Sequence, residues 1–179
     1  MKNLKIIVLL TLIICASLAF AQSKAPTVQV ELNAADLGPR AIEDLTSKSV
    51  PRDYGFAWQT MAQALDQNRL DLINGYFTGF AKANLTDRIK QQIKNDLHVR
   101  YTDHGHKLTA IFYSPNGDVM QLRDDAQFEI QVLDGDKLIH SEPAHLQYMV
   151  LMTPGADRWL VRDLQAVPTK ESNTAKLIK

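Results

Sequence analysis

The sequence predicts a single α+β domain in which helices come first along the chain and cover one face of an antiparallel sheet. Two observations carry this prediction. Apolar residues recur with helical spacing as far as Leu97, and beyond it the period falls to two, as in strands. Two turn dipeptides, Asn116-Gly117 and Asp134-Gly135, then divide the second half into long strands of a meander.

Residues 1–21 have the pattern of a secretory signal peptide. Lys2 and Lys5 precede a short apolar stretch, and Ala19-Phe20-Ala21 is a small-x-small cleavage pattern. The apolar stretch is too short for a membrane span, which needs about 20 apolar residues. We therefore expect cleavage after Ala21, a secreted or periplasmic protein, and no stable membrane anchor after cleavage.

The charge and cysteine content exclude several classes of partner and site. Without residues 1–21, the chain holds 18 basic against 20 acidic side chains. Such a balance gives no general attraction for nucleic acid or anionic lipid. The single cysteine, Cys15, lies in the predicted signal peptide, so the exported part has no thiol nucleophile and no disulfide. The domain therefore has to fold by burying apolar side chains.

The domain itself is predicted to cover residues 36–168. Ahead of it, residues 22–35 form a polar leader, in which the alternating stretch 27–32 suits an edge strand or an ordered arm. Behind it, residues 169–179 are mostly polar and are predicted to be disordered.

Four helices are predicted in the first half of the domain. The first covers Leu37–Lys48, and the second begins at Pro51, because proline is tolerated in a first helical turn. The third covers Leu70–Ala83. The fourth follows Thr86, whose hydroxyl suits an N-cap, and its buried face ends at Leu97. Each has apolar residues at spacings of three and four; those of the second helix are Tyr54, Trp58, Met61 and Leu65.

Four strands are predicted in the second half, at residues 107–114, 119–133, 137–152 and 158–167. The even-numbered residues of the second strand are apolar with one exception, so they are predicted to form the inner wall of the sheet. They are Met120, Leu122, Asp124, Ala126, Phe128, Ile130 and Val132.

This order of elements resembles the nuclear transport factor 2-like (NTF2-like) superfamily, also called SnoaL-like. Three stretches carry the likeness: YGFAWQTMAQALDQNRLDLINGYF for paired helices, YSPNGDVMQLR for the first hairpin and DRWLVRDLQAVP for the closing strand. The resemblance covers about residues 50–168. It implies a strongly curved, cone-like sheet, a cystatin-like roll, and a homodimer formed through the sheets. The superfamily includes isomerases, dehydratases, hydrolases, ligand binders and oligomerisation modules, so the fold does not choose the function.

One acidic residue stands on the predicted inner wall. A two-residue turn at Asp-Gly in the second hairpin would place Asp124 opposite His145, with Thr109 and Gln147 beside them. A carboxylate and an imidazole in contact can act as a general acid/base pair, so Asp124 and His145 are the candidate catalytic residues. A structural hydrogen bond is the alternative. A bulge near Pro143 would instead send His145 to the opposite face.

Large aromatic side chains are predicted to fill or line the cone, and they include Phe112 and Trp159. Core packing and a pocket for a small apolar molecule are both open. The candidate ligand-binding residues are Tyr54, Trp58, Thr109, Phe128, Gln147 and Tyr148.

Three of the five histidines lie in HVRYTDHGHK, residues 98–107. His104 and His106 form a His-x-His pair, which can begin a zinc site, but Gly105 between them indicates a bend. His98 suits the negative end of a helix dipole. We therefore predict that these histidines lie at solvent-exposed ends of strands, and that the protein has neither a metal nor a cofactor.

The leading functional hypothesis is an exported domain that binds a small apolar ligand or a partner chain without catalysis. The first alternative is an isomerase, dehydratase or hydrolase that uses Asp124 and His145. The second is an accessory subunit of a cell-envelope assembly that docks through residues 22–35. An interior filled by Trp58, Phe128 and their neighbours would exclude catalysis inside the cone.

Overall fold

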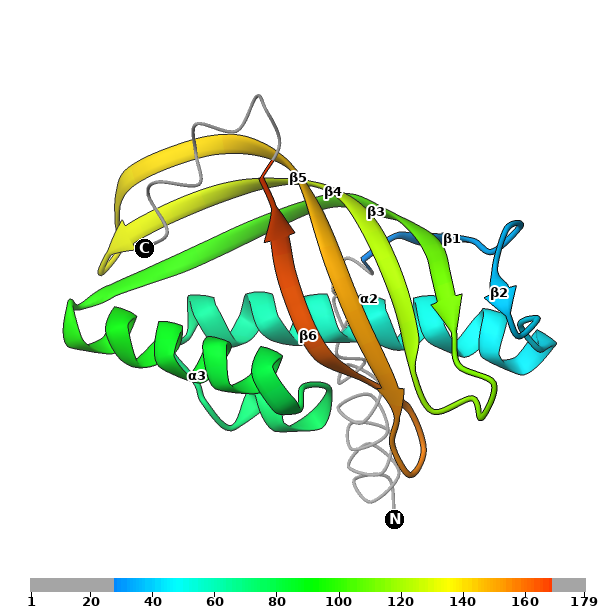
Figure 1. The fold of residues 1–179 in the computed structure, drawn as a ribbon. Coiled ribbons are helices and arrows are strands. Elements are labelled where there is room, and N and C mark those ends of the chain that lie inside the picture. Colours follow the sequence, from blue (N-terminus) through cyan, green and yellow to red (C-terminus); the bar gives the residue numbers. More distant parts are fainter. Residues whose placement is uncertain (1–27, 169–179) are drawn as a thin grey trace, which may run out of the picture.

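The computed structural model describes residues 28–168, which form two α-helices lying on the concave side of a curved sheet (Figure 1). The predicted signal peptide, residues 22–27 of the leader and the tail at 169–179 lie outside these residues. No helix within 28–168 is long and apolar enough to cross a membrane.

The helical half contains fewer elements than predicted. Helix α2 covers Asp44–Asp66, the 3-10 helix η1 covers Leu72–Gly75, and α3 covers Gly79–Lys94. The predicted boundary at Pro51 is wrong, because this proline lies inside α2. Proline removes one helical hydrogen bond, but its neighbour Val50 is fully buried, and packing holds the helix together through this point.

The predicted boundary at Thr86 is also wrong. Thr86 lies inside α3, where its Oγ1 donates a hydrogen bond of 2.8 Å to the carbonyl oxygen of Lys82. A threonine that bonds back to the preceding turn is compatible with a helix interior, so its hydroxyl did not mark a helix start. The predicted third and fourth helices are therefore replaced by η1 and α3.

The four predicted strands are confirmed as an antiparallel meander. They are β3 (Leu97–Tyr113), β4 (Met120–Asp134), β5 (Lys137–Pro154) and β6 (Trp159–Val167), paired in that order. Strand β3 begins earlier than predicted, directly after α3. Its register against β4 shifts at Gly105, whose φ is +130°, so the bend expected there is confirmed.

Two short strands make the sheet mixed. Strand β1 (Val30–Asn33) and strand β2 (Gly38–Pro39) both run parallel to β3. The edge-strand alternative for the leader is thus the one observed, and Val30 packs against the core. Because β2 lies within the stretch 37–48, the predicted first helix is wrong in its first half.

The predicted inner wall of the sheet is confirmed. On β4, every even-numbered side chain from Met120 to Ile130 is less than 9% exposed, and the apolar stripe of α2 packs against this face. Phe112 does not join the core and is 37% exposed. The register between β3 and β4 shifts between Ala110 and Phe112, which breaks the alternation of buried and exposed positions there.

Candidate functional site

Asp124 is fully buried on the inner face of β4, but its predicted contact with His145 is wrong. Strand β5 places Tyr148 opposite Asp124, and His145 lies opposite Gln127. His145 is exposed, and its Nε2 contacts Asp125 on the outer face of the sheet. The predicted pairing therefore joins two residues that lie on opposite faces.

The physical reason is the geometry of the β4–β5 hairpin. Asp134 pairs with Lys137, so the turn residues are Gly135 and Asp136 and not Asp134 and Gly135. A second register shift follows between Val132 and Leu133. The two effects together move β5 by three positions, which reverses the face of every side chain on it.

The partner of Asp124 is another histidine. His106 Nδ1 lies 2.8 Å from Asp124 Oδ2, and the Tyr54 hydroxyl donates a 2.7 Å hydrogen bond to the same oxygen. The other ring nitrogen of His106, Nε2, lies 2.7 Å from Asp103 Oδ2. We call these four residues, Tyr54, Asp103, His106 and Asp124, the tetrad; Asp103 is half-buried, and the other three are buried. Since His106 is only 2% exposed, its predicted place at a solvent-exposed strand end is wrong, whereas His104 is exposed.

The register of β3 explains how His106 reaches Asp124. The residue opposite Asp124 is Leu108, and His106 lies opposite Ala126, so the two tetrad residues are diagonal neighbours on one face. Thr109 lies opposite Arg123 and is not beside Asp124. This register differs by one residue from the register counted from the Asn116-Gly117 turn, because the pairing shifts between Ala110 and Phe112; the shift at Gly105 lies beyond both residues.

Both ring nitrogens of His106 face carboxylate oxygens, which only accept hydrogen bonds. Both nitrogens must therefore donate, which requires the charged imidazolium. Burial lowers the pKa of His106, but the hydrogen bonds to Asp103 and Asp124 outweigh it and raise the pKa to about 9. Burial and the nearby charge of Asp124 raise the pKa of Tyr54 well above its usual value, so Tyr54 stays a hydrogen-bond donor.

The interior around the tetrad is filled by aromatic rings. The Trp58 ring lies with its centroid 4.4 Å from that of His106, 5.6 Å from Phe128 and 5.5 Å from Tyr148. Asp124 Oδ1 and Trp58 Nε1 are buried and have no hydrogen-bond partner among residues 28–168. The tetrad is thus closed off from substrate-sized molecules in this structure.

The six candidate ligand-binding residues do not form one pocket. Tyr54, Trp58 and Phe128 are buried core residues, and Tyr148 is half-buried against Trp58. Gln147 lies opposite Asp125. None of the six lines either of the two surface pockets described next for residues 28–168.

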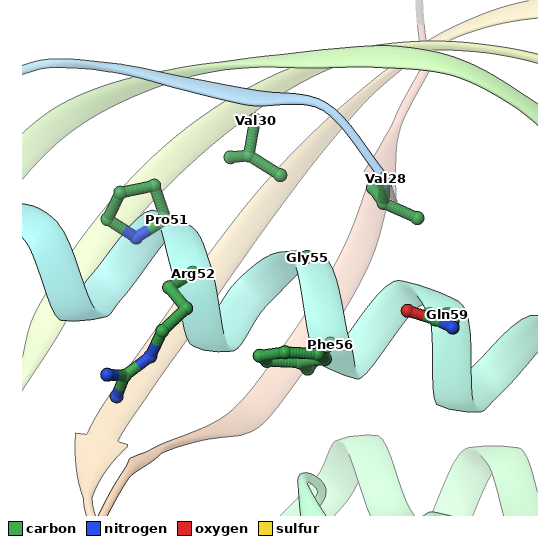
Figure 2. Close-up of a pocket in the computed structure, with 7 residues that line it drawn as sticks. All are labelled: Val28, Val30, Pro51, Arg52, Gly55, Phe56 and Gln59. Atoms are coloured by element: carbon green, nitrogen blue, oxygen red, sulfur yellow. The ribbon is translucent and has the colours of Figure 1, made fainter. Parts of the chain in front are cut away.

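The smaller pocket, about 200 Å³, lies between β1 and α2 (Figure 2). In Figure 2, Val28 and Val30 of the leader lie above Gly55 of the helix, and Arg52 and Phe56 lie below it. A Cβ atom at Gly55 would come within 3.3 Å of Val30 Cγ2. Glycine at this position therefore lets β1 pack closely on α2.

The larger pocket is an open groove of about 610 Å³ between α3 and the far end of the sheet. Its apolar floor comes from β3 and β4, and its walls come from α3 and β5. We call it the α3 groove; it is lined by Leu97, Val99, Ile130 and Val132, by Asn84, Asp87, Arg88, Gln91, Gln92 and Asn95, and by His140 and Glu142. In Figure 1, the β4–β5 hairpin rises away from α3 at this end of the sheet.

The α3 groove is open because β6 is short. Strand β6 ends at Val167, opposite Gln147, so it leaves the first half of β5 uncovered by any strand among residues 28–168. Strands β4 and β5 continue past this point, and their hairpin lies away from α3 (Figure 1). The apolar spacing of this helical segment predicted its buried face but gave no signal for the groove.

Two polar side chains of α3 are fixed in the groove by hydrogen bonds. Arg88 Nη2 donates to the Tyr101 hydroxyl at 2.7 Å. Gln92 Nε2 donates to the Leu65 carbonyl oxygen and to Asn68 Oδ1, both at 2.9 Å. Gln92 is 8% exposed, and its Oε1 has no hydrogen-bond partner within the described part of the chain. This buried acceptor is therefore left unsatisfied within the described residues.

Comparisons with known proteins identify a shared fold. No family model and no curated protein match the chain. Among solved structures, the intermembrane space region of the chloroplast protein ARC6 matches with a TM-score of 0.61 and 11% sequence identity, over 73% of this chain and 100% of that one. At this identity the likeness shows the fold alone.

Matches with lower TM-scores include a periplasmic fragment of TraM, at 0.46 with 13% identity over 65% of this chain and 95% of that one. They also include a protein of the NTF2-like family from Streptomyces avermitilis, at 0.45 with 10% identity over 66% and 95%. Matches with TM-scores in this range support no conclusion about this chain. The architecture that the NTF2-like resemblance implied, helices on a strongly curved antiparallel sheet, is nevertheless the one observed.

Proposed function

We propose that the chain is an exported binding domain that holds another molecule in the α3 groove and carries out no reaction. The observation that carries the proposal is the difference in accessibility between the tetrad and the α3 groove. The tetrad lies under Trp58 with Asp124 fully buried, whereas the groove is open and has an apolar floor. Its volume falls within the range of about 300–1,000 Å³ that is typical of ligand sites.

The groove also has the composition of a binding site. Four apolar side chains of β3 and β4 form its floor, and polar groups converge on it from α3 and β5. Binding sites commonly combine an apolar lining with a few polar groups that fix the orientation of the bound molecule. Arg88 shares the groove with the two carboxylates Asp87 and Glu142, and His140 Nε2 lies 3.5 Å from Glu142 Oε2, so the groove favours no strongly charged ligand.

Catalysis by the predicted pair is not part of this proposal. His145 lies on the outer face with Asp125, and Asp124 is held by Tyr54 and His106. The envelope-assembly alternative agrees with export and with the position of the leader, because Val30–Asn33 is an ordered strand at the edge of the sheet. This strand pairs with β3 on one side, so a partner in such an assembly would have to add to its other side.

An apolar fluorescent probe, N-phenyl-1-naphthylamine, tests whether the groove binds. We expect the full-length protein to enhance its emission, and Val132→Glu to weaken binding about tenfold or more, because a carboxylate in the floor opposes apolar contact. Ile111→Glu is the matched control, since Ile111 is 41% exposed on β3 and does not line the groove. Circular dichroism would confirm that both variants fold.

The proposal fails if the probe does not bind. It also fails if Val132→Glu, still folded, binds the probe as well as the wild-type protein does.

A further inference from the structure

We infer that the α3 groove holds an extended peptide segment of a partner protein, whose backbone is hydrogen-bonded by the carboxamide side chains of α3. The inference rests on the proposed function and names the occupant of the same site. Three features of the groove carry it: the chemistry of its helical wall, one unpaired buried acceptor, and the spacing of its floor.

The helical wall is rich in carboxamides. Asn84, Gln91, Gln92 and Asn95 all line the groove from α3, and three of them, Asn84, Gln91 and Asn95, are exposed to solvent. Each carboxamide offers two N–H donors and one carbonyl acceptor. A peptide backbone presents the same two kinds of group at every residue except proline, so this wall complements an extended chain.

Gln92 supplies the second feature. Its Nε2 is committed to Leu65 and Asn68, which fixes the orientation of the amide and leaves Oε1 as the free end. Oε1 is buried and has no hydrogen-bond partner among residues 28–168. A buried polar atom left without a partner is unfavourable, and an incoming backbone N–H would satisfy it.

The floor has the spacing of an extended chain. Ile130 and Val132 stand two residues apart on one face of β4, and Val99 lies opposite Val132. Side chains two apart on a strand are separated by roughly 6.6 Å, which is also the spacing of alternate side chains in a bound extended peptide. A segment with apolar residues at alternate positions would therefore place them on this floor while its backbone faces α3.

Selection from a phage-displayed library of random twelve-residue peptides, with the full-length protein as target, tests the inference. We expect enriched peptides to carry apolar residues at alternate positions. Binding of the best peptide, made synthetically, should be abolished by Val132→Glu. It should weaken about tenfold when Asn84→Leu and Gln91→Met are combined, because near-isosteric apolar side chains remove the hydrogen bonds.

Three controls separate backbone contacts from general apolar binding. Lys90→Met, on the exposed side of α3, should leave peptide binding unchanged. The combined Asn84→Leu and Gln91→Met variant should bind N-phenyl-1-naphthylamine as the wild-type protein does. The same peptide with alternate backbone nitrogens methylated should lose about tenfold in affinity if α3 contacts the backbone.

Three outcomes overturn the inference: no peptide is enriched, the enriched peptides ignore Val132→Glu, or the carboxamide variant binds them as tightly as the wild type. If the dye still binds in those cases, the groove remains a binding site and only its peptide occupant is wrong. If neither dye nor peptide binds, the proposed function is wrong as well.

Discussion

At the scale of single residues, the feature that matters most is a buried cation held between two carboxylates. His106 faces Asp124 with one ring nitrogen and Asp103 with the other, and its side chain is fully buried. Removing charges from water is costly, so such a group persists only where its partners compensate the loss. The tetrad achieves this with two carboxylates and the Tyr54 hydroxyl, and we assign it a structural role.

This arrangement predicts a specific dependence of stability on pH. Because the pKa of His106 rises from 6.5 to about 9 on folding, its contribution is fully present below pH 6.5 and is lost as the pH rises through 9. His106→Gln should therefore lower the free energy of unfolding by about 3 kcal/mol at pH 6 and by much less at pH 10. Urea unfolding of both proteins across this range measures the difference.

His145→Gln provides the matched control, because it removes an imidazole beside an aspartate on the exposed face. Surface pairs contribute little, so its effect should stay small and should not change between pH 6 and 10. A difference between wild type and His106→Gln that is the same at both ends of the range would refute the charged state of His106.

At the scale of elements, the sequence predicted the kind of structure better than the register. The change of period after Leu97 and the inner face of β4 both follow from alternation along one segment, which sequence contains. The partner of Asp124 depends on three register shifts and on which two residues form a turn. The register shifts and the turn residues are set by tertiary packing. Each single shift moves the side chains of a strand to the opposite face of the sheet. The histidine on the inner face was therefore misidentified.

The irregularity of β3 at Gly105 turns the side chain of His106 toward the inner face of the sheet. Its φ of +130° is unfavourable for residues with a side chain, although a Cβ atom there would meet only the Gln29 carbonyl oxygen, at 3.9 Å. Gly105→Ala should thus cost about 1–3 kcal/mol through backbone strain and not through a clash. If the strand straightens in response, His106 leaves the tetrad, and the pH dependence described above should diminish.

Gly135→Ala controls for the general cost of adding a side chain at a positive φ. Gly135 has a φ of +54° in the β4–β5 turn, and a Cβ atom there would meet nothing within 4 Å. We expect a cost of about 1–2 kcal/mol with the pH profile unchanged. A Gly105→Ala variant that keeps both its stability and its pH profile would contradict the role of this bulge.

At the scale of the whole molecule, the strands of the sheet differ in length, and shorter strands cover its two edges only in part. Among residues 28–168, one edge, on β3, is covered by β1 and β2 only between His106 and Tyr113, and the other edge is covered by β6 only along the second half of β5. The β4–β5 hairpin rises away from α3 (Figure 1), and the groove lies between α3 and this end of the sheet. The lengths of β5 and β6 were predicted from sequence, but the curvature that separates the sheet from α3 is a property of the packed strands and was not.

The close packing of β1 on α2 makes the leader part of the domain, and Gly55 controls it. In Figure 2, Val28 and Val30 lie directly over this glycine, where a Cβ atom would come within 3.4 Å of the Val28 carbonyl oxygen. Gly55→Leu should push β1 off the helix and lower the free energy of unfolding by about 1–3 kcal/mol, as overpacking does elsewhere. Hydrogen exchange should show lost protection at Val30–Asn33, while β4 and β5 keep theirs. Gln59→Leu, at a half-buried position of α2 on the same pocket, is the control that should leave β1 protected. Full protection of β1 in Gly55→Leu would mean that the leader is held by its pairing with β3 alone and not by the helix.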